Sequence, residues 1–126
     1  MILDTNALSA FIDGDRAVGE HLAAGHRHPA IPVIVLGEFR YGVAGSRHRA
    51  AYEAWLDAHL ADFDVLSVTE ATAVVYADLR VALKKAGHPM PANDAWISAL
   101  ALEHRLPVLT RDVHFDAVPG LRRVGW

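Results

Sequence analysis

Residues 1–12, MILDTNALSAFI, open the chain with a short apolar run that ends at the acid Asp4 and is followed by a second apolar stretch. Residues 1–3 are short and apolar, as a buried strand is, and an aspartate directly before an apolar segment is a common start of a helix. Residues 13–15, Asp-Gly-Asp, are turn formers that would end this helix. The opening stretch therefore predicts a strand that leads directly into a helix, with an acid at the junction.

The same alternation continues to the end of the chain. Helices are predicted at 16–24, 33–44, 46–62, 70–86 and 93–104, and strands at 28–32, 64–68, 107–109 and, after a Pro-Gly turn, in the residues up to 124. Thr69 is the expected N-cap of the helix that ends near Ala86. Strands that alternate with helices predict the α/β class, with a mainly parallel sheet covered by helices. We see no internal repeat or low-complexity tract, and we expect one domain over residues 1–126.

Composition limits the possible functions. The chain is 52% hydrophobic, contains no cysteine and carries a formal net charge of −3. Cysteine-based zinc sites, thiolate nucleophiles and disulfides are excluded, and a net negative chain does not bind nucleic acid by bulk electrostatics. We find no membrane-spanning run and no signal-peptide pattern at the N-terminus, so a soluble, cytoplasmic protein is expected.

Four acids occupy positions where a parallel sheet gathers ligands. Asp4 follows the first strand and Asp112 follows the strand at 107–109, so both belong at the carboxyl edge of the sheet if their strands are neighbours. Glu38 and Asp94 lie on predicted helices, and helical spacing places Asp94 on the same face as several apolar residues. A carboxylate facing inward is costly unless it is paired or bound to a metal.

A site built only from carboxylate oxygens suits hard cations such as Mg²⁺ or Mn²⁺. Such an ion activates water and neutralises the charge that develops when a phosphodiester is cleaved. It would also overcome the repulsion between four acids and a nucleic acid. Taken singly, Asp4 is explained as an N-cap, Asp112 as a turn residue, and Glu38 and Asp94 as ordinary helix acids. The joint arrangement favours one metal site for phosphodiester hydrolysis.

Four stretches, in this order along the chain, resemble the PIN-domain nucleases, and within them the VapC-like toxins of bacterial toxin–antitoxin pairs. They are residues 2–6 (ILDTN), 35–42 (VLGEFRYG), 93–99 (NDAWISA) and 109–115 (LTRDVHF), the last running into 118–121 (VPGL). The resemblance spans nearly the whole chain. It implies a Rossmann-like α/β/α sandwich with a mainly parallel central sheet and Mg²⁺-dependent endoribonuclease activity, for which Mn²⁺ would substitute.

The resemblance also implies roles for individual residues. The catalytic and metal-binding acids of the family correspond here to Asp4, Glu38, Asp94 and Asp112. Asn6 and Thr110 match polar positions that usually orient those acids, and Asp116 is a possible additional acid. The implied partners are an RNA substrate and a cognate VapB-like antitoxin, in a homodimer or a toxin–antitoxin hetero-oligomer that inhibits translation or growth.

Several alternatives stay open. The chain could be a PIN-like module that binds RNA or protein without catalysis, or another metal-dependent phosphoesterase, although a phosphatase with an aspartyl nucleophile at Asp4 would usually have an acid where Asn6 stands. The residues Arg40, Arg47, Arg49 and Arg111 could hold RNA phosphates, and salt bridges to acids are equally plausible for them.

Overall fold

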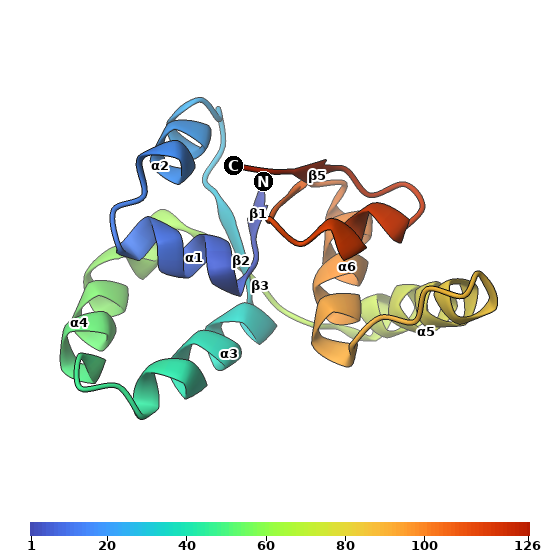
Figure 1. The fold of residues 1–126 in the computed structure, drawn as a ribbon, viewed down its shortest axis with the longest axis horizontal. Helices are drawn as coiled ribbons and strands as arrows, with labels where there is room; N and C mark the ends of the chain where they lie inside the picture. Colours follow the sequence, from blue (N-terminus) through green and yellow to red (C-terminus); the bar gives the residue numbers. More distant parts are fainter.

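A computed structural model describes residues 1–126, and its helices and strands alternate along the chain (Figure 1). The strands are β1 (Ile2–Leu3), β2 (Ala30–Pro32), β3 (Asp64–Leu66), β4 (Val108–Leu109) and β5 (Arg123–Val124). The α-helices are α1 (Thr5–Ile12), α2 (Arg16–Ala23), α3 (Val33–Ala44), α4 (Arg49–His59), α5 (Glu70–Lys85) and α6 (Ala92–His104), and the short 3-10 helices are η1 (Leu60–Asp62) and η2 (Val113–Ala117).

The five strands form one sheet in the order β3-β2-β1-β4-β5, and all neighbouring pairs are parallel. From β1 the chain builds outward to β2 and β3, then crosses through α5 and α6 to place β4 on the other side of β1. The direction of winding therefore reverses between β1 and β4. In open α/β sheets the crevice at the carboxyl ends of the strands beside such a reversal is where ligands bind.

The central strands are apolar because helices cover the sheet. Ile2 and Leu3 of β1 and Val108 and Leu109 of β4 are fully buried, within a single cluster of 23 buried hydrophobic residues. In the view of Figure 1, α1 to α4 lie to the left of β1 and β2, whereas α5 and α6 lie to the right. The predicted α/β class with a mainly parallel sheet is confirmed.

Side-chain caps begin three of the α-helices. Asp4 Oδ1 accepts from the backbone N–H of Ala7 at 2.8 Å at the start of α1, and Asp15 caps α2 in the same way through Val18 N at 3.1 Å. Thr69 caps α5, as predicted, in a reciprocal pair with Thr72. Asp4 is therefore an N-cap, whatever else it does.

Several boundaries differ from the predictions, and the strand expected over 28–32 begins only at Ala30. The helix expected over 46–62 begins only at Arg49 and finishes as the 3-10 turn η1, and the strand expected over 64–68 ends at Leu66. Helix η2 was not predicted, because its five residues are too few to show a period. It forms where the Asp112 carboxylate caps the backbone N–H of His114 at 2.9 Å.

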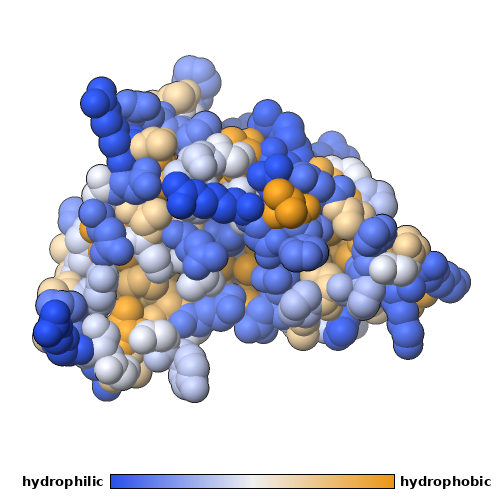
Figure 2. All heavy atoms as spheres, viewed as in Figure 1, coloured by the Kyte–Doolittle hydropathy of each residue, from blue (hydrophilic) through white to orange (hydrophobic).

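The surface is largely polar. On the face drawn in Figure 2, hydrophilic residues predominate and hydrophobic ones are scattered among them. Large hydrophobic side chains that are exposed include Tyr41 on α3 and Val74 and Val81 on α5. None of the helices combines the length and the apolar character that crossing a membrane requires.

Candidate functional site

Asp4 and Asp112 lie at the reversal point of the sheet. Leu3 of β1 is in register with Leu109 of β4, and Asp4 N, the next residue along, donates to Leu109 O at 3.4 Å. Asp112 follows β4 after Thr110 and Arg111. Parallel neighbouring strands therefore bring two acids that are far apart in the sequence to the same edge of the sheet, as predicted from their positions.

The Asp4 carboxylate is almost completely buried, with 6% of the residue exposed. Burial raises the pKa of Asp4, the hydrogen bonds from the Thr110 hydroxyl and the Ala7 backbone oppose this effect, and the negative charges of Asp112 and Glu38 add to it. The ionised form of Asp4 is thus costly in the protein alone. A bound cation would offset both the lost hydration of the Asp4 carboxylate and its repulsion by the neighbouring acids.

Asp94 stands in the first turn of α6, where its side chain is half-buried. Burial is the main cause that raises the pKa of Asp94, followed by the negative charges of Asp112, Glu38 and Asp4. The charge of His114 acts in the opposite direction. Because the charges of the three other acids all raise the pKa of Asp94, the four predicted carboxylates lie close enough to interact electrostatically.

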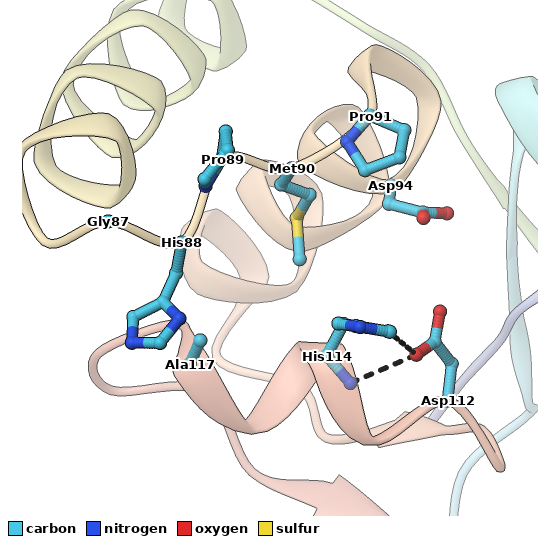
Figure 3. Close-up of a pocket in the computed structure, with 9 residues that line it drawn as sticks. All are labelled: Gly87, His88, Pro89, Met90, Pro91, Asp94, Asp112, His114 and Ala117. Carbon is cyan, nitrogen blue, oxygen red and sulfur yellow. Dashed lines mark hydrogen bonds and ion pairs between the residues drawn. The ribbon is translucent and has the colours of Figure 1, made fainter.

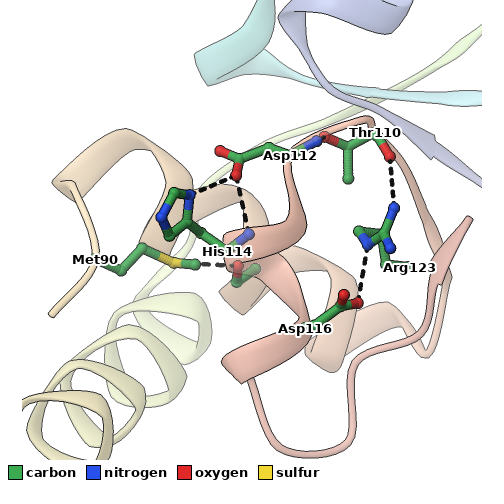
Figure 4. Close-up of polar contacts among 7 residues, drawn as sticks. Met90, Thr110, Asp112, His114, Asp116 and Arg123 are labelled. Atoms are coloured by element: carbon green, nitrogen blue, oxygen red, sulfur yellow. Dashed lines mark hydrogen bonds and ion pairs between the residues drawn. The ribbon is translucent and has the colours of Figure 1, made fainter. Parts of the chain in front are cut away.

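Asp112 differs from the other acids in having its own donors. Its Oδ1 atom accepts from His114 N at 2.9 Å and lies 2.7 Å from His114 Nδ1, as Figure 4 shows. Partial burial would raise the pKa of Asp112, but the backbone and ring of His114 and the charge of Arg123 outweigh it, so that the pKa is lowered. Asp112 is therefore more readily ionised than Asp4 or Asp94.

Glu38 reaches the site from α3. Its Oε1 atom accepts from the Thr5 hydroxyl at 3.1 Å, in a partly buried contact between α3 and the first residue of α1. Thr5 was not among the predicted site residues. Its position directly after Asp4 was the available signal, but nothing in the sequence shows that it faces Glu38.

Of the three residues predicted to support the acids, only Thr110 contacts them. Thr110 is fully buried, and its hydroxyl accepts from Asp112 N at 3.0 Å as well as interacting with Asp4, so it links two acids. Asn6 is exposed and has no hydrogen bond to any of the four acids, so its predicted role stays a prediction. Asp116 instead accepts from Arg123 Nε at 2.8 Å (Figure 4).

Arg123 was missed by the sequence reasoning. Besides holding Asp116, its Nη1 atom donates to the Thr110 carbonyl at 3.4 Å, which ties β5 to the loop after β4. Lone arginines in short edge strands give no pattern that would identify them.

The predicted phosphate-binding arginines are mostly engaged elsewhere. Arg111 lies over the Trp126 ring at 4.7 Å and donates to the Trp126 carbonyl at 3.2 Å, and Arg49 pairs with Glu53 at 2.8 Å. Arg47 Nε donates to its neighbour His48 at 3.3 Å. Arg40, on α3 two residues beyond Glu38, is exposed and forms no ion pair. It is thus the predicted arginine that remains available to a phosphate.

The donor set fits Mg²⁺ or Mn²⁺ in its chemistry. No three acid or histidine side chains are arranged closely enough to bind one ion directly. Mg²⁺, however, commonly binds through one or two carboxylates and completes its shell with water and substrate oxygens. Four mutually repelling carboxylates, one of them buried, fit an ion held in that way. Direct ligation by all four acids stays a prediction.

Comparison with known proteins agrees with the fold. The sequence model of the PIN-domain family matches residues 1–121 of this chain. The chain is 36% identical over 126 residues to the ribonuclease VapC5 of Mycobacterium tuberculosis, in a match that covers 98% of this chain and 90% of that protein.

Two solved structures contain chains with the same fold. One is VapBC2 from Rickettsia felis bound to a DNA fragment from their promoter, with a TM-score of 0.90, 26% identity and coverage of 99% of this chain and 97% of that one. The other is VapBC-5 from Mycobacterium tuberculosis, a member of the VapBC family of toxin-antitoxin systems, with a TM-score of 0.73, 35% identity and coverage of 98% and 97%.

Proposed function

Because the chain belongs to the PIN-domain family, we propose that it is a ribonuclease of the VapC type, which hydrolyses RNA phosphodiesters with Mg²⁺ or Mn²⁺ and acts as the toxin of a toxin–antitoxin pair. The observation that carries the proposal is the proximity of Asp4, Asp94 and Asp112 near the reversal point of the sheet, where the charge of Asp112 raises the pKa of both Asp4 and Asp94. Buried repelling carboxylates are retained at a cost in stability, which favours a functional reason for them.

The bound metal would supply Lewis-acid stabilisation of the phosphate and a more acidic water. Asp4 and Asp94 are positioned to hold such an ion, because their charges lack a nearby cationic partner of comparable strength. Asp112 completes the set, with its carboxylate fixed by His114 and its backbone fixed by Thr110. These contacts orient the acids before any ligand arrives, which reduces the reorganisation needed for the reaction.

Glu38 would bind the metal or orient the attacking water. Thr5 occupies its Oε1 atom at 3.1 Å, which leaves Oε2 to accept a proton. Arg40, on the same helix and exposed, is placed to contact a phosphate of the RNA. The net charge of −3 makes such a local cation and the metal the main sources of attraction for RNA.

The protein partners follow from the relatives. We propose a VapB-like antitoxin as inhibitor and a homodimer or toxin–antitoxin hetero-oligomer as the assembly, with inhibition of translation or growth by the free toxin. The exposed hydrophobic side chains of Tyr41, Val74 and Val81 are chemically suited to a protein interface, since such residues are costly to leave in water.

The function is tested with protein purified free of any antitoxin. Structured RNA is incubated with an equimolar amount of the protein, in the presence of either Mn²⁺ or EDTA. The products are separated on a denaturing gel. Cleavage with Mn²⁺ is expected for wild type and for Asp78→Asn, a change of an exposed acid on α5. Asp94→Asn is expected to reduce cleavage by at least about 100-fold, because the metal loses a ligand. Cleavage that survives in EDTA or in Asp94→Asn, with the fold verified by circular dichroism, would show that the proposal is wrong.

A further inference from the structure

A cavity of about 420 Å³ lies beside two of the four acids, Asp94 and Asp112 (Figure 3). One wall is the connector 87–91 between α5 and α6, and the opposite wall is formed by His114 and Ala117 of η2. Asp94 and Asp112 line the cavity, so that it adjoins the proposed cleavage site. Its volume falls within the range of pockets that hold small organic groups. We call it the connector cavity.

The His114 wall is held in place by a contact that the fold does not need. Asp112 already caps η2 through the His114 backbone, yet its Oδ1 atom also fixes the imidazole through Nδ1 at 2.7 Å. Because an ionised Asp112 can only accept, Nδ1 of His114 donates in this contact, and the other ring nitrogen, Nε2, forms no hydrogen bond with the protein. The His114 side chain is 85% exposed, so packing in the core does not explain its position.

The connector wall is equally well defined. Gly87 has a positive φ of 79° that turns the chain out of α5, and the two prolines at 89 and 91 limit the backbone after it. Met90 is 6% exposed, and its sulfur lies 3.6 Å from the Ser98 hydroxyl of α6. His88 also faces the cavity (Figure 3). The cavity is therefore bounded by two imidazole rings, two proline rings and a thioether.

The charges select the kind of ligand. The only formally charged residues that line the cavity, apart from the histidines, are Asp94 and Asp112, and no lysine or arginine takes part. An anionic group such as a second phosphate would be repelled there. A flat, neutral ring fits, because aromatic and histidine side chains stack on unpaired RNA bases and polar atoms such as Nε2 of His114 read their edges.

We propose that the connector cavity receives the base of a nucleotide next to the scissile phosphate, and that contact with His114 and His88 gives the enzyme a base preference at that position. The proposal rests on the proposed ribonuclease function, since a phosphate held at the acids would place a neighbouring base within reach of the cavity. It assigns a role in substrate selection to residues outside the four carboxylates.

The test uses the two methionines of the chain as internal reporters. Met90 lines the cavity, whereas Met1 lines a separate cavity formed at the end of α2 and the loop that follows it. The metal-free full chain, labelled with ¹³C at the methionine methyl groups, is titrated with adenosine, guanosine, cytidine and uridine. These probes are neutral, so the acids do not repel them. A saturable shift of the Met90 methyl signal with at least one nucleoside is expected, and the Met1 signal should stay in place.

Two variants connect the titration with cleavage. Ala117→Leu adds bulk on the η2 wall without altering an acid, and His88→Ala removes one ring from the opposite wall. Either change should abolish the nucleoside-dependent shift of Met90. With Mn²⁺, the ratio of kcat/KM between the best and the worst base beside the cleaved bond should fall by about 10-fold. This is the change expected when one base-stacking contact is lost. His26→Ala, at the separate cavity, is the matched control and should leave the ratio unchanged.

The outcomes separate the two proposals. RNA cleavage by wild type together with a Met90 signal that none of the four nucleosides moves would overturn the nucleotide-binding role of the cavity and leave the ribonuclease function standing. A base preference that survives in both cavity variants would overturn it as well. A nucleoside-dependent Met90 shift in a protein that never cleaves RNA would support a nucleoside site here and refute the ribonuclease function.

Discussion

Replacing Asp4 by asparagine should stabilise the metal-free protein at neutral pH. Asparagine is as good an N-cap as aspartate, so its side-chain oxygen can still accept from Ala7 N, which now lies 2.8 Å from Asp4 Oδ1. What the substitution removes is a nearly buried negative charge that Asp112 and Glu38 repel. The folded state therefore loses a destabilising interaction while the unfolded state changes little.

The size of the effect follows from the environment of Asp4. At an effective dielectric constant of about 20, two unit charges about 4 Å apart repel by about 4 kcal/mol, and the repulsion falls in inverse proportion to their distance. Asp112 and Glu38 both act in this sense, whereas two hydrogen bonds favour the charged form of Asp4 and partly offset them. A net stabilisation of about 1–2 kcal/mol is expected, which corresponds to a rise in Tm of about 4–8 °C for a domain of this size.

The pH dependence has a definite sign. The pKa of Asp4 is raised in the folded protein, so the folded state binds the proton more strongly than the unfolded state does. The resulting stabilisation is fully present below the unfolded pKa of about 3.9 and is lost as the pH rises through the folded pKa. Asp94 is raised in the same direction. In EDTA, the stability advantage of Asp4→Asn over wild type should therefore grow as the pH increases from about 4 to about 7.

Metal should reverse the order of stability. An ion present at about 100 times its dissociation constant stabilises wild type by about 2.7 kcal/mol, whereas the variant, with one ligand fewer, gains less. Thermal unfolding is followed by circular dichroism for both proteins, in EDTA and in Mn²⁺. If Asp4→Asn is less stable than wild type in EDTA at neutral pH, or if Mn²⁺ raises both Tm values equally, the assignment of Asp4 to a charged, metal-binding cluster is wrong.

Three further changes test a buried hydrogen bond and two backbone conformations by urea unfolding. Thr72→Val should cost about 1–3 kcal/mol, since the fully buried hydroxyl donates to Glu103 at 2.8 Å and belongs to the cap of α5; an unchanged midpoint would mean that the bond contributes nothing. Gly87→Ala should cost about 1 kcal/mol through its φ of 79° alone, because no atom lies within 4 Å of the added Cβ; a loss well above this would reveal a clash. Arg105→Gly should gain about 1 kcal/mol, because Arg105 ends α6 with a φ of 55°, and a loss would show that its side chain compensates for the strained backbone.

Local sequence rules predict much of this fold. The apolar strand before Asp4, the cap at Thr69 and the helical face of Asp94 are each encoded by neighbours within a few residues, and the structure has all three. The placement of Asp4 and Asp112 at the end of their strands was predicted for the same reason, since strand ends are visible in the apolar pattern. Positions of this kind need no knowledge of the tertiary structure.

The contacts between distant elements could not be predicted in this way. Thr5 donates to Glu38 across α1 and α3, and Arg123 holds Asp116 across the last turn, but neither pair has a periodic signature. Asn6, chosen from the resemblance, has no hydrogen bond to the acids, whereas its neighbour Thr5 has one. Which of two adjacent polar residues faces a partner depends on the rotation of the helix, and rotation is set by packing.

The two roles of Asp4 can be separated by comparing substitutions. Asp4→Ala removes both the charge and the cap, whereas Asp4→Asn removes only the charge, so the difference in stability between the two variants measures the cap. It should be about 1 kcal/mol in favour of asparagine, and it should be the same in EDTA and in Mn²⁺, because the cap is a bond to the Ala7 backbone and not to the ion. A carboxylate has about four acceptor positions, so one bond to Ala7 leaves room for a metal. A difference that changes with Mn²⁺ would mean that the asparagine side chain also contacts the ion, so that the comparison would not isolate the cap.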